Sequence, residues 1–340
     1  MTGRADSIIR ARAVDAALAA VLANGRRHPG YDVTVEKVIL VTGASGFIGS
    51  HLARALVDAG YRVRAMTRRP ETYGGAGAAV AGDVGDRGAL DAALEGVDAA
   101  YYLVHSLDSD DFEERDARGA RNFAAASADA GLERIVYLGG LGSDGADLSA
   151  HLRSRRSVER LLRDGEVPVT VLRAAVVVGH GSISWEITRQ LVDHLPALVT
   201  PRWVNTRVQP IALEDVIRYL AGVLEPESAR GQVYEIGGPD VLRYIDMLER
   251  AAAVKGKNLP NVTVPLLTPR LSSAWLALVT DVDLGTARNL VDSMTAEVIV
   301  HDKSIEDVVP GATLGYEESV RVALADRTRA TSTGSGRSRR

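Results

Sequence analysis

The sequence predicts a doubly wound parallel α/β sheet with a smaller C-terminal lobe, and two observations carry this prediction. From about residue 37 onward, short runs of β-branched residues alternate with longer segments rich in alanine and leucine, as in successive parallel βαβ units. A glycine-rich turn at Gly43–Gly49 separates the first such run from the first helical segment. Strand, turn and helix thus stand in the order that a doubly wound sheet requires.

The predicted strands are continuous apolar runs, which is typical of strands that are covered on both faces. The first strand is Val38–Val41, and the helix after it, Ser50–Ala59, is closed by Gly60. The series continues with Tyr61–Met66, Ala99–Val104, Ile135–Leu138 and Val169–Val178. Right-handed crossovers between these strands build the doubly wound sheet.

The turn between the first strand and the first helix has the composition of a dinucleotide-binding loop. Its residues are Gly43, Ala44, Ser45, Gly46, Phe47, Ile48 and Gly49. Gly43 permits the tight turn, Gly46 lets backbone N–H groups approach phosphates, and Gly49 lets the helix pack close to its strand. The helix N-terminus adds its partial positive charge. The loop therefore predicts that the pyrophosphate of a nicotinamide dinucleotide binds here, in the fold named after Rossmann.

The end of the second strand favours NADP over NAD. This strand leads into Arg68 and Arg69, where no carboxylate is present to accept a hydrogen bond from a ribose 2′-hydroxyl. Guanidinium groups match the charge and the oxygen array of a 2′-phosphate. In the alternative interpretation the two arginines are solvated loop charges, so NAD stays open as the cofactor.

The composition is that of an ordinary globular protein and excludes several classes of function. The 340 residues are 46% hydrophobic and 25% charged, and the net charge of −4 provides no positive field for nucleic acid. No run approaches the roughly 18 apolar residues of a membrane span. The chain has no cysteine for a disulfide, a thiolate metal site or a nucleophile. We expect a cytoplasmic protein with a small-molecule substrate, no nucleic-acid partner and no metal.

The chain divides into four expected segments. Residues 1–36 form an N-terminal extension, and residues 37–180 form the NAD(P)-binding Rossmann domain. Residues 181–328 form a substrate-side lobe, from which a strand at Val233–Ile236 returns to the sheet. We expect residues 329–340 to be a disordered tail, because Ser, Thr, Gly and Arg cannot offset the entropy of ordering.

These motifs resemble the atypical and extended branch of the short-chain dehydrogenase/reductase superfamily, which includes NmrA-like NAD(P)H-binding proteins. The resemblance runs from about Lys37 to about Asp326, and the Gly-x-x-Gly-x-x-Gly spacing is of the extended type. It implies that Gln209–Val216 is the helix entry that closes the substrate lobe. It also implies further cofactor contacts, from Asp83, Val84, Val104, His105 and Asn122.

The chain departs from this family at the catalytic positions. Catalytic members carry a serine or threonine after the fifth strand and a Tyr-x-x-x-Lys pair about a dozen residues later. Here Gly139 and Gly140 follow the fifth strand, and the pair has become His151 and Arg155. Residues four apart share one helix face. The resemblance therefore implies that Arg155 could hold the cofactor ribose, while a histidine of intrinsic pKa ~6.5 could donate a proton at neutral pH.

Two other interpretations of these positions stay open. His151 and Arg155 could simply belong to a solvated, charged helix. Alternatively Tyr102, with Tyr101 and His105, is a competing source of protons near the nicotinamide, although strand tyrosines usually serve packing.

The preferred function is an NADP(H)-dependent oxidoreductase whose small organic substrate is held by the lobe after Gly181, with hydride chemistry supplied by the cofactor. The missing Ser-Tyr-Lys set favours an alternative of another class, a non-catalytic NAD(P)H sensor or accessory subunit. A nucleotide-sugar epimerase ranks last, because such enzymes usually keep the tyrosine. A helix-face dimer is common in the superfamily, so a homodimer is compatible with the resemblance.

Overall fold

The computed structural model describes residues 37–106, 111–142, 148–195, 198–200, 202–263, 294 and 296–334. The expected N-terminal extension, residues 1–36, lies outside the described residues. So do residues 335–340 of the expected tail.

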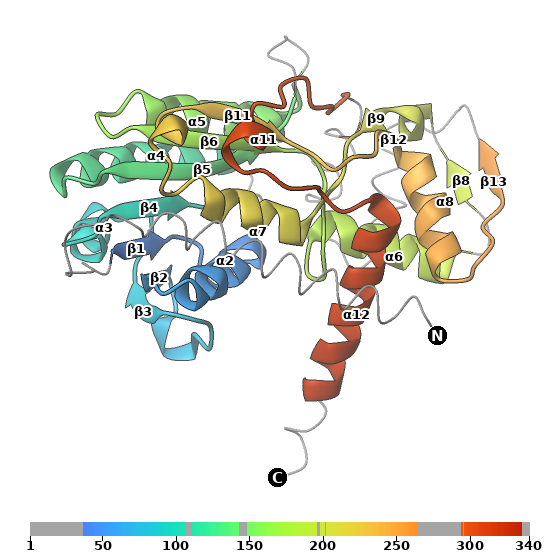
Figure 1. Ribbon diagram of the computed structural model, residues 1–340, viewed down its shortest axis with the longest axis horizontal. Coiled ribbons are helices and arrows are strands. Elements are labelled where there is room, and N and C mark those ends of the chain that lie inside the picture. The colour runs from blue at the N-terminus through green and yellow to red at the C-terminus, as the bar shows by residue number, and fades with distance from the viewer. Residues whose placement is uncertain are drawn as a thin grey trace.

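A seven-stranded sheet forms the centre of the molecule (Figure 1), with the strand order β11-β6-β5-β4-β1-β2-β3. Its strands are β1 (Val38–Val41), β2 (Arg62–Thr67), β3 (Ala78–Ala81), β4 (Ala99–Tyr102), β5 (Arg134–Gly140), β6 (Val169–Ala174) and β11 (Val233–Ile236). All neighbouring strands pair parallel, which confirms the predicted fold class. The order reverses between β1 and β4, and doubly wound sheets bind ligands at such a reversal.

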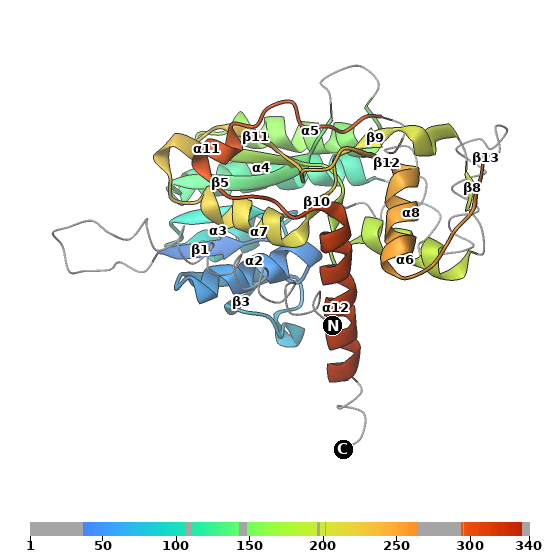
Figure 2. The same ribbon diagram turned by 45° about the vertical axis from the view of Figure 1, so that its right-hand side comes forward.

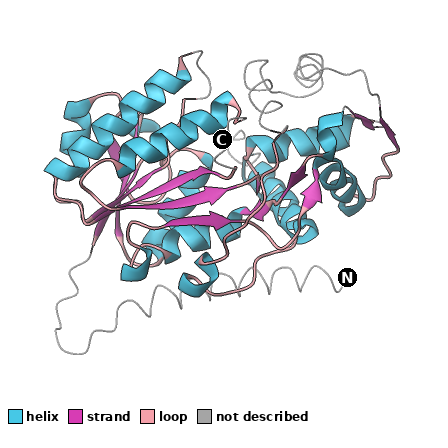
Figure 3. Cartoon of the chain, turned by 90° about the horizontal axis from the view of Figure 1, so that it is seen from above, coloured by secondary structure: helices cyan, strands magenta, loops and turns pink. Residues whose placement is uncertain are grey.

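Helices cover both faces of this sheet (Figure 3). One face carries α2 (Phe47–Asp58) and α7 (Leu213–Gly222), and the other carries α3 (Arg87–Leu94), α4 (Phe112–Asp129) and α5 (Ala150–Arg163). Successive side chains of a strand point to opposite faces. Val41 therefore enters the core under α2 and α7, whereas Leu40 enters the core under α3, α4 and α5. The sheet thus lies between two separate apolar cores, one on each face.

Helix α7 differs from the expectation that it closes the substrate lobe. It packs beside α2 on the sheet (Figure 1), and its Val216 and Leu220 are fully buried in the same core as Val41. The apolar face of this helix matches the sheet, so α7 belongs to the nucleotide-binding layer. Helix α7 also contains the buried Arg218–Asp215 ion pair of 3.1 Å.

A smaller group of elements lies beside the carboxyl ends of the strands (Figures 1 and 2). Its helices are α6 (Ile183–His194), α8 (Tyr244–Val254) and α12 (Tyr316–Gly334), which enclose a third core around Trp185, Leu248 and Val320. Its short strands are β7 (Val177–Val178), β8 (Leu198–Thr200), β9 (Arg207–Val208), β10 (Ile211–Ala212), β12 (Leu242–Arg243) and β13 (Asn261–Thr263). The remaining short elements are η1 (Pro70–Thr72), η2 (Arg202–Asn205), η3 (Glu227–Ala229) and α11 (Ile305–Val308).

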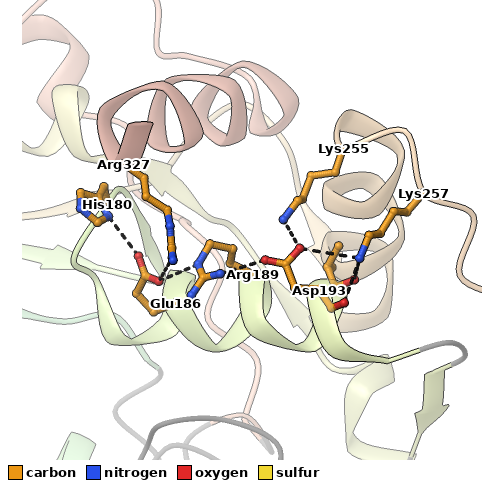
Figure 4. A network of polar contacts seen from close by, with 8 residues as sticks. His180, Glu186, Arg189, Asp193, Lys255, Lys257 and Arg327 are labelled. Carbon is orange, nitrogen blue, oxygen red and sulfur yellow. Dashed lines mark hydrogen bonds and ion pairs between the residues drawn. The ribbon is translucent and has the colours of Figure 1, made fainter. Parts of the chain in front are cut away.

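Ion pairs fasten α6 to α8 and α12 (Figure 4). Asp193 at the end of α6 accepts hydrogen bonds from Lys255, which follows α8, and from Arg189 at 2.8 Å. Glu186 in the first turn of α6 accepts from Arg327 of α12 at 3.1 Å. The lobe is thus held by charge as well as by its apolar core.

The C-terminal helix extends into the segment that was expected to be a disordered tail. Helix α12 continues through Gly334 and projects from the body of the molecule (Figure 2), so residues 329–334 of the expected tail are helical. Local hydrogen bonds offset part of the entropy of ordering. Thr331 Oγ1 donates to the carbonyl oxygen of Arg327 at 3.1 Å, and Arg329 pairs with Asp326 at 2.7 Å. Among the described helices, none combines the length and the apolar content needed to cross a lipid bilayer.

Candidate functional site

The glycine turn has the backbone geometry that its sequence predicts. Gly43 has a φ of 63°, and a Cβ atom there would lie 3.0 Å from the carbonyl oxygen of Leu103. A Cβ atom on Gly49 would lie only 2.2 Å from the carbonyl oxygen of Gly43. Both positions therefore require glycine, the first for its conformation and the second for the close contact of helix and turn.

Helix α2 begins directly after this turn, with its positive end open. Gly46 is the N-cap residue and provides no side-chain cap. The first N–H groups of a helix have no acceptor within it, so those of Phe47, Ile48 and Gly49 are available to a ligand. An anion is the ligand that such a helix N-terminus favours.

A cavity of about 390 Å³, here called the polar cavity, lies in front of the turn at the ends of β1 to β4. The predicted cofactor residues in its walls are Gly43, Ser45, Gly46, Arg68, Asp83, Val84, Val104 and His105. The Asp83 carboxylate accepts a hydrogen bond from Gly85 N at 2.7 Å, which shapes the loop after β3. The structure thus brings together residues that the sequence spreads over about sixty positions.

Three predicted cofactor residues line neither this cavity nor the one described next. Ala44 is fully buried, and its N–H donates to the carbonyl oxygen of Met66. Arg69 is exposed outside the cavity walls. Asn122 donates to the carbonyl oxygens of Val84 and Gly85, at 3.2 Å each, so it supports the cavity wall from behind. In this structure Ala44 is thus a packing residue, Arg69 is exposed to solvent and Asn122 supports a loop, and their direct cofactor contacts stay predictions.

A second cavity of about 320 Å³, here called the apolar cavity, continues from the first. The two share Gly43, Gly46, Leu103, His105 and Ile183, so they form one groove. Most walls of the apolar cavity are aliphatic, from Leu138, Leu141, Val176, Val177, Met294 and Val298. Its polar side chains are His105, His151, Arg155, Ser182, Ser184 and Tyr244.

His151 and Arg155 both face this cavity from α5, so neither is simply a solvated charge of a surface helix. Ser149 caps the helix by accepting a hydrogen bond from Leu152 N at 3.3 Å, which fixes the first turn and with it His151. Arg155 follows one turn later and forms no ion pair with any carboxylate of the described residues. His151 and Arg155 thus lie on the same face of α5, as predicted, and this face lines the apolar cavity.

The protonation state of His151 differs from the expectation. Burial, with the positive charge of Arg155 and the nearby His105, lowers the pKa of His151 to about 3. Burial and Arg155 lower the pKa of His105 to about 3 as well, although part of its surface faces the open groove. Both imidazoles are therefore neutral at pH 7. A neutral imidazole can donate an N–H hydrogen bond to a carbonyl oxygen, as in triosephosphate isomerase.

The structure removes Tyr102 from the candidate proton donors. Tyr102 lines neither cavity and is 1% exposed, and its ring packs against Phe123 with 5.0 Å between centroids. Burial raises the pKa of its phenol well above the usual value. Tyr101 points to the opposite face of the sheet, where its hydroxyl donates to the carbonyl oxygen of Leu220 at 2.9 Å. Both tyrosines are packing residues beneath helices.

Strand β5 ends with Gly139 and Gly140, where catalytic family members carry a hydroxyl side chain. The space beside this position is tightly packed. Gly139 and Gly140 line the apolar cavity. A Cβ atom on Gly140 would lie 2.8 Å from Cδ2 of Leu152, so any side chain there requires Leu152 to move. The structure also places Ser184 and Tyr244 in this cavity, two residues that no sequence motif identified.

The comparisons with known proteins agree with this geometry. A family model described as NAD(P)H-binding matches residues 43–195. A (4-alkanoyl-5-oxo-2,5-dihydrofuran-3-yl)methyl phosphate reductase of Streptomyces griseus is 33% identical over 234 residues, which cover 65% of this chain and 75% of that protein. A putative dihydroflavonol 4-reductase of Synechocystis is 26% identical over 333 residues, 86% of this chain and 94% of that protein.

Among solved structures, an NADPH-dependent quinone oxidoreductase of Escherichia coli, complexed with NADPH, superposes with a TM-score of 0.69. The match has 21% identity and covers 83% of this chain and 98% of that chain, so it concerns the fold. Motif, fold and relatives agree, and the predicted resemblance is confirmed. The chain belongs to the NAD(P)H-binding, atypical short-chain dehydrogenase/reductase family.

Proposed function

We propose that the protein is an NADPH-dependent reductase that acts on the carbonyl group of a small, largely apolar organic molecule. The observation that carries this proposal is the single groove, in which the polar cavity at the glycine turn leads directly into the apolar cavity. A dinucleotide whose phosphates lie at the turn would extend toward His151 and Arg155. Both curated relatives are named as reductases, which supports the reaction class.

The residues of the polar cavity fit the phosphate-bearing end of the cofactor. The N–H groups at the start of α2 would bind the pyrophosphate, and a side chain at Gly49 would fill the space that the turn needs. Arg68 lies at the end of β2, where the ribose 2′-position is read in doubly wound sheets. A guanidinium there favours a 2′-phosphate and hence NADPH.

The residues of the apolar cavity fit the reacting end. When bound, NADPH supplies a hydride to the carbonyl carbon of the substrate. The neutral imidazole of His151 would donate its N–H hydrogen bond to the carbonyl oxygen, and the charge of Arg155 would stabilise the alkoxide that forms. The alkoxide would take the imidazole proton, and a water molecule entering along the groove would protonate the ring again and leave as hydroxide. The aliphatic walls limit the access of bulk water to the reacting atoms and favour an apolar substrate.

One observation favours a second candidate, a non-catalytic NADPH-binding protein. The chain has neither the hydroxyl after β5 nor the Tyr and Lys of catalytic family members, and Leu152 fills the space beside Gly140. On this account His151 and Arg155 contribute to binding the nicotinamide end only. The epimerase alternative would need a tyrosine where His151 stands.

Two measurements on the purified full-length chain separate these candidates. The fluorescence of NADPH, and then of NADH, is titrated with protein, and a panel of quinones, ketones and enones is screened for NADPH consumption. A reductase binds NADPH and consumes it with at least one member of the panel. Binding without consumption across the panel favours the second candidate, and a protein that binds neither dinucleotide contradicts both.

A further inference from the structure

Arginine side chains from two elements line the polar cavity. Arg68 lines the cavity from the end of β2, while Arg115 and Arg118 line it from α4. We propose that Arg115 and Arg118 complete, together with Arg68, the site that selects the 2′-phosphate of NADPH over the 2′-hydroxyl of NADH. This inference rests on the proposed function, because it requires the groove to hold a nicotinamide dinucleotide.

The face of α4 that carries these arginines is fixed by contacts with the loop after β3. A Cβ atom on Gly119 would lie 2.8 Å from Cγ2 of Val84, so the helix backbone presses directly on that loop. Asn122, on the same side of the helix, donates to the carbonyl oxygen of Val84 at 3.2 Å. Residues three and four apart share a helix face. Arg115 and Arg118 therefore continue this face toward the start of α4, at the ligand-binding edge of the sheet.

The described walls of the polar cavity carry more positive than negative side chains. Its walls contain Arg68, Arg115 and Arg118, against a single carboxylate, Asp83. In the part of the chain that the structure describes, these three arginines form no ion pair with a carboxylate, and the Asp83 carboxylate already accepts a hydrogen bond from Gly85 N. Like charges at this helical spacing repel. A phosphate carries about −1.5 to −2 charges at pH 7 and three acceptor oxygens, and it would remove this repulsion.

A different role for the same arginines predicts a different result. A guanidinium that only stacks on the adenine ring would bind NADPH and NADH equally, because both carry the same ring. A guanidinium that contacts the 2′-phosphate would affect NADPH alone. The ratio of the two dissociation constants therefore distinguishes selection of the phosphate from general support of the cofactor.

The test compares Arg115→Ala and Arg118→Ala with the wild-type chain. Dissociation constants for NADPH and NADH are measured by fluorescence titration at fixed salt, and 2′,5′-ADP and 5′-AMP are used as competing probes. Arg121→Ala is the matched control, because Arg121 lies one turn further on α4 and does not line the polar cavity. It borders a separate cavity between α4 and α5, which Arg118 also borders. Thermal unfolding of each variant shows that the fold is retained.

We expect each variant to weaken binding of NADPH and of 2′,5′-ADP by roughly tenfold, the effect of one charge-assisted hydrogen bond. Binding of NADH and 5′-AMP should change less than about twofold, and Arg121→Ala should resemble the wild type. Equal losses for NADPH and NADH, or no loss in either variant, overturn the inference. A wild-type chain that binds neither dinucleotide refutes the proposed function instead, so the two failures are distinguishable.

Discussion

The polar and apolar cavities lie end to end in one groove, yet they are built in different ways. The polar cavity depends on one short turn whose backbone is restricted at Gly43 and Gly49, and its functional groups are N–H groups and guanidinium groups. The apolar cavity is assembled from distant parts of the chain, since Ser184 comes from α6, Tyr244 from α8 and Met294 from outside any described helix or strand. A single substitution at a backbone-restricted glycine should therefore abolish cofactor binding in the polar cavity. Substitutions in the apolar cavity should instead alter turnover, each through the one side chain that it removes.

The largest effect is expected at the helix contact of the turn. We expect Gly49→Ala to lower the free energy of unfolding by about 1–3 kcal/mol, as overpacking does, and to remove measurable NADPH binding, because the added Cβ atom would lie 2.2 Å from the Gly43 carbonyl oxygen. Chemical denaturation and NADPH fluorescence measure both effects. Gly74→Ala is the control, since a Cβ atom there meets nothing within 4 Å. Full binding by Gly49→Ala would show that the turn does not set the cofactor site.

The next effect is expected at the other end of the groove. His151→Ala should reduce kcat by roughly 10²–10⁴-fold, the range for loss of a proton donor, while the NADPH dissociation constant stays within about twofold because the phosphate contacts are intact. Stopped-flow turnover with an accepted substrate measures the first quantity, and fluorescence titration the second. His301→Ala, an exposed histidine outside both cavities, is the control. Unchanged kcat in His151→Ala removes this residue from the mechanism.

The two histidines of the apolar cavity, His105 and His151, should make the free energy of unfolding depend on pH. The native pKa values of His105 and His151 are about 3, below the ordinary 6.5, so the unfolded chain binds more protons than the native chain between these values. Native stability therefore falls as the pH is lowered through this window. The double variant His105→Gln/His151→Gln should lose stability less steeply between pH 7 and pH 5 in urea unfolding experiments. Parallel curves for variant and wild type would contradict the assigned pKa values.

The smallest effect is expected at Tyr102. Because its ring packs beneath α4 and lines neither cavity, Tyr102→Phe should leave kcat and the NADPH dissociation constant unchanged. Removing one hydroxyl should change the free energy of unfolding by less than about 1.5 kcal/mol. Turnover measured beside His151→Ala is the comparison, and a tenfold loss of kcat in Tyr102→Phe would return this tyrosine to the catalytic candidates.

The same contrast explains how much the sequence could predict. The turn and Arg68 belong to one contiguous strand-turn-helix-strand unit, so their spacing predicted that they lie at the same cavity. Tyr102 was misjudged because a strand end near the cofactor does not reveal which face of the sheet a side chain enters. The lowered pKa of His151 depends first on burial, then on Arg155 and then on His105, 46 positions earlier in the chain. The nearness of Arg155 follows from the spacing of four residues, but no local pattern reveals the burial or the contact with His105.

The close packing of Gly140 and Leu152 constrains any attempt to redesign the apolar cavity. A serine at position 140, as in other family members, would place its Cβ atom 2.8 Å from Cδ2 of Leu152, so the flexible end of that side chain would have to move. A designer would therefore vary positions 140 and 152 together. The two positions should be mutationally coupled, because the side chain tolerated at one depends on the side chain at the other.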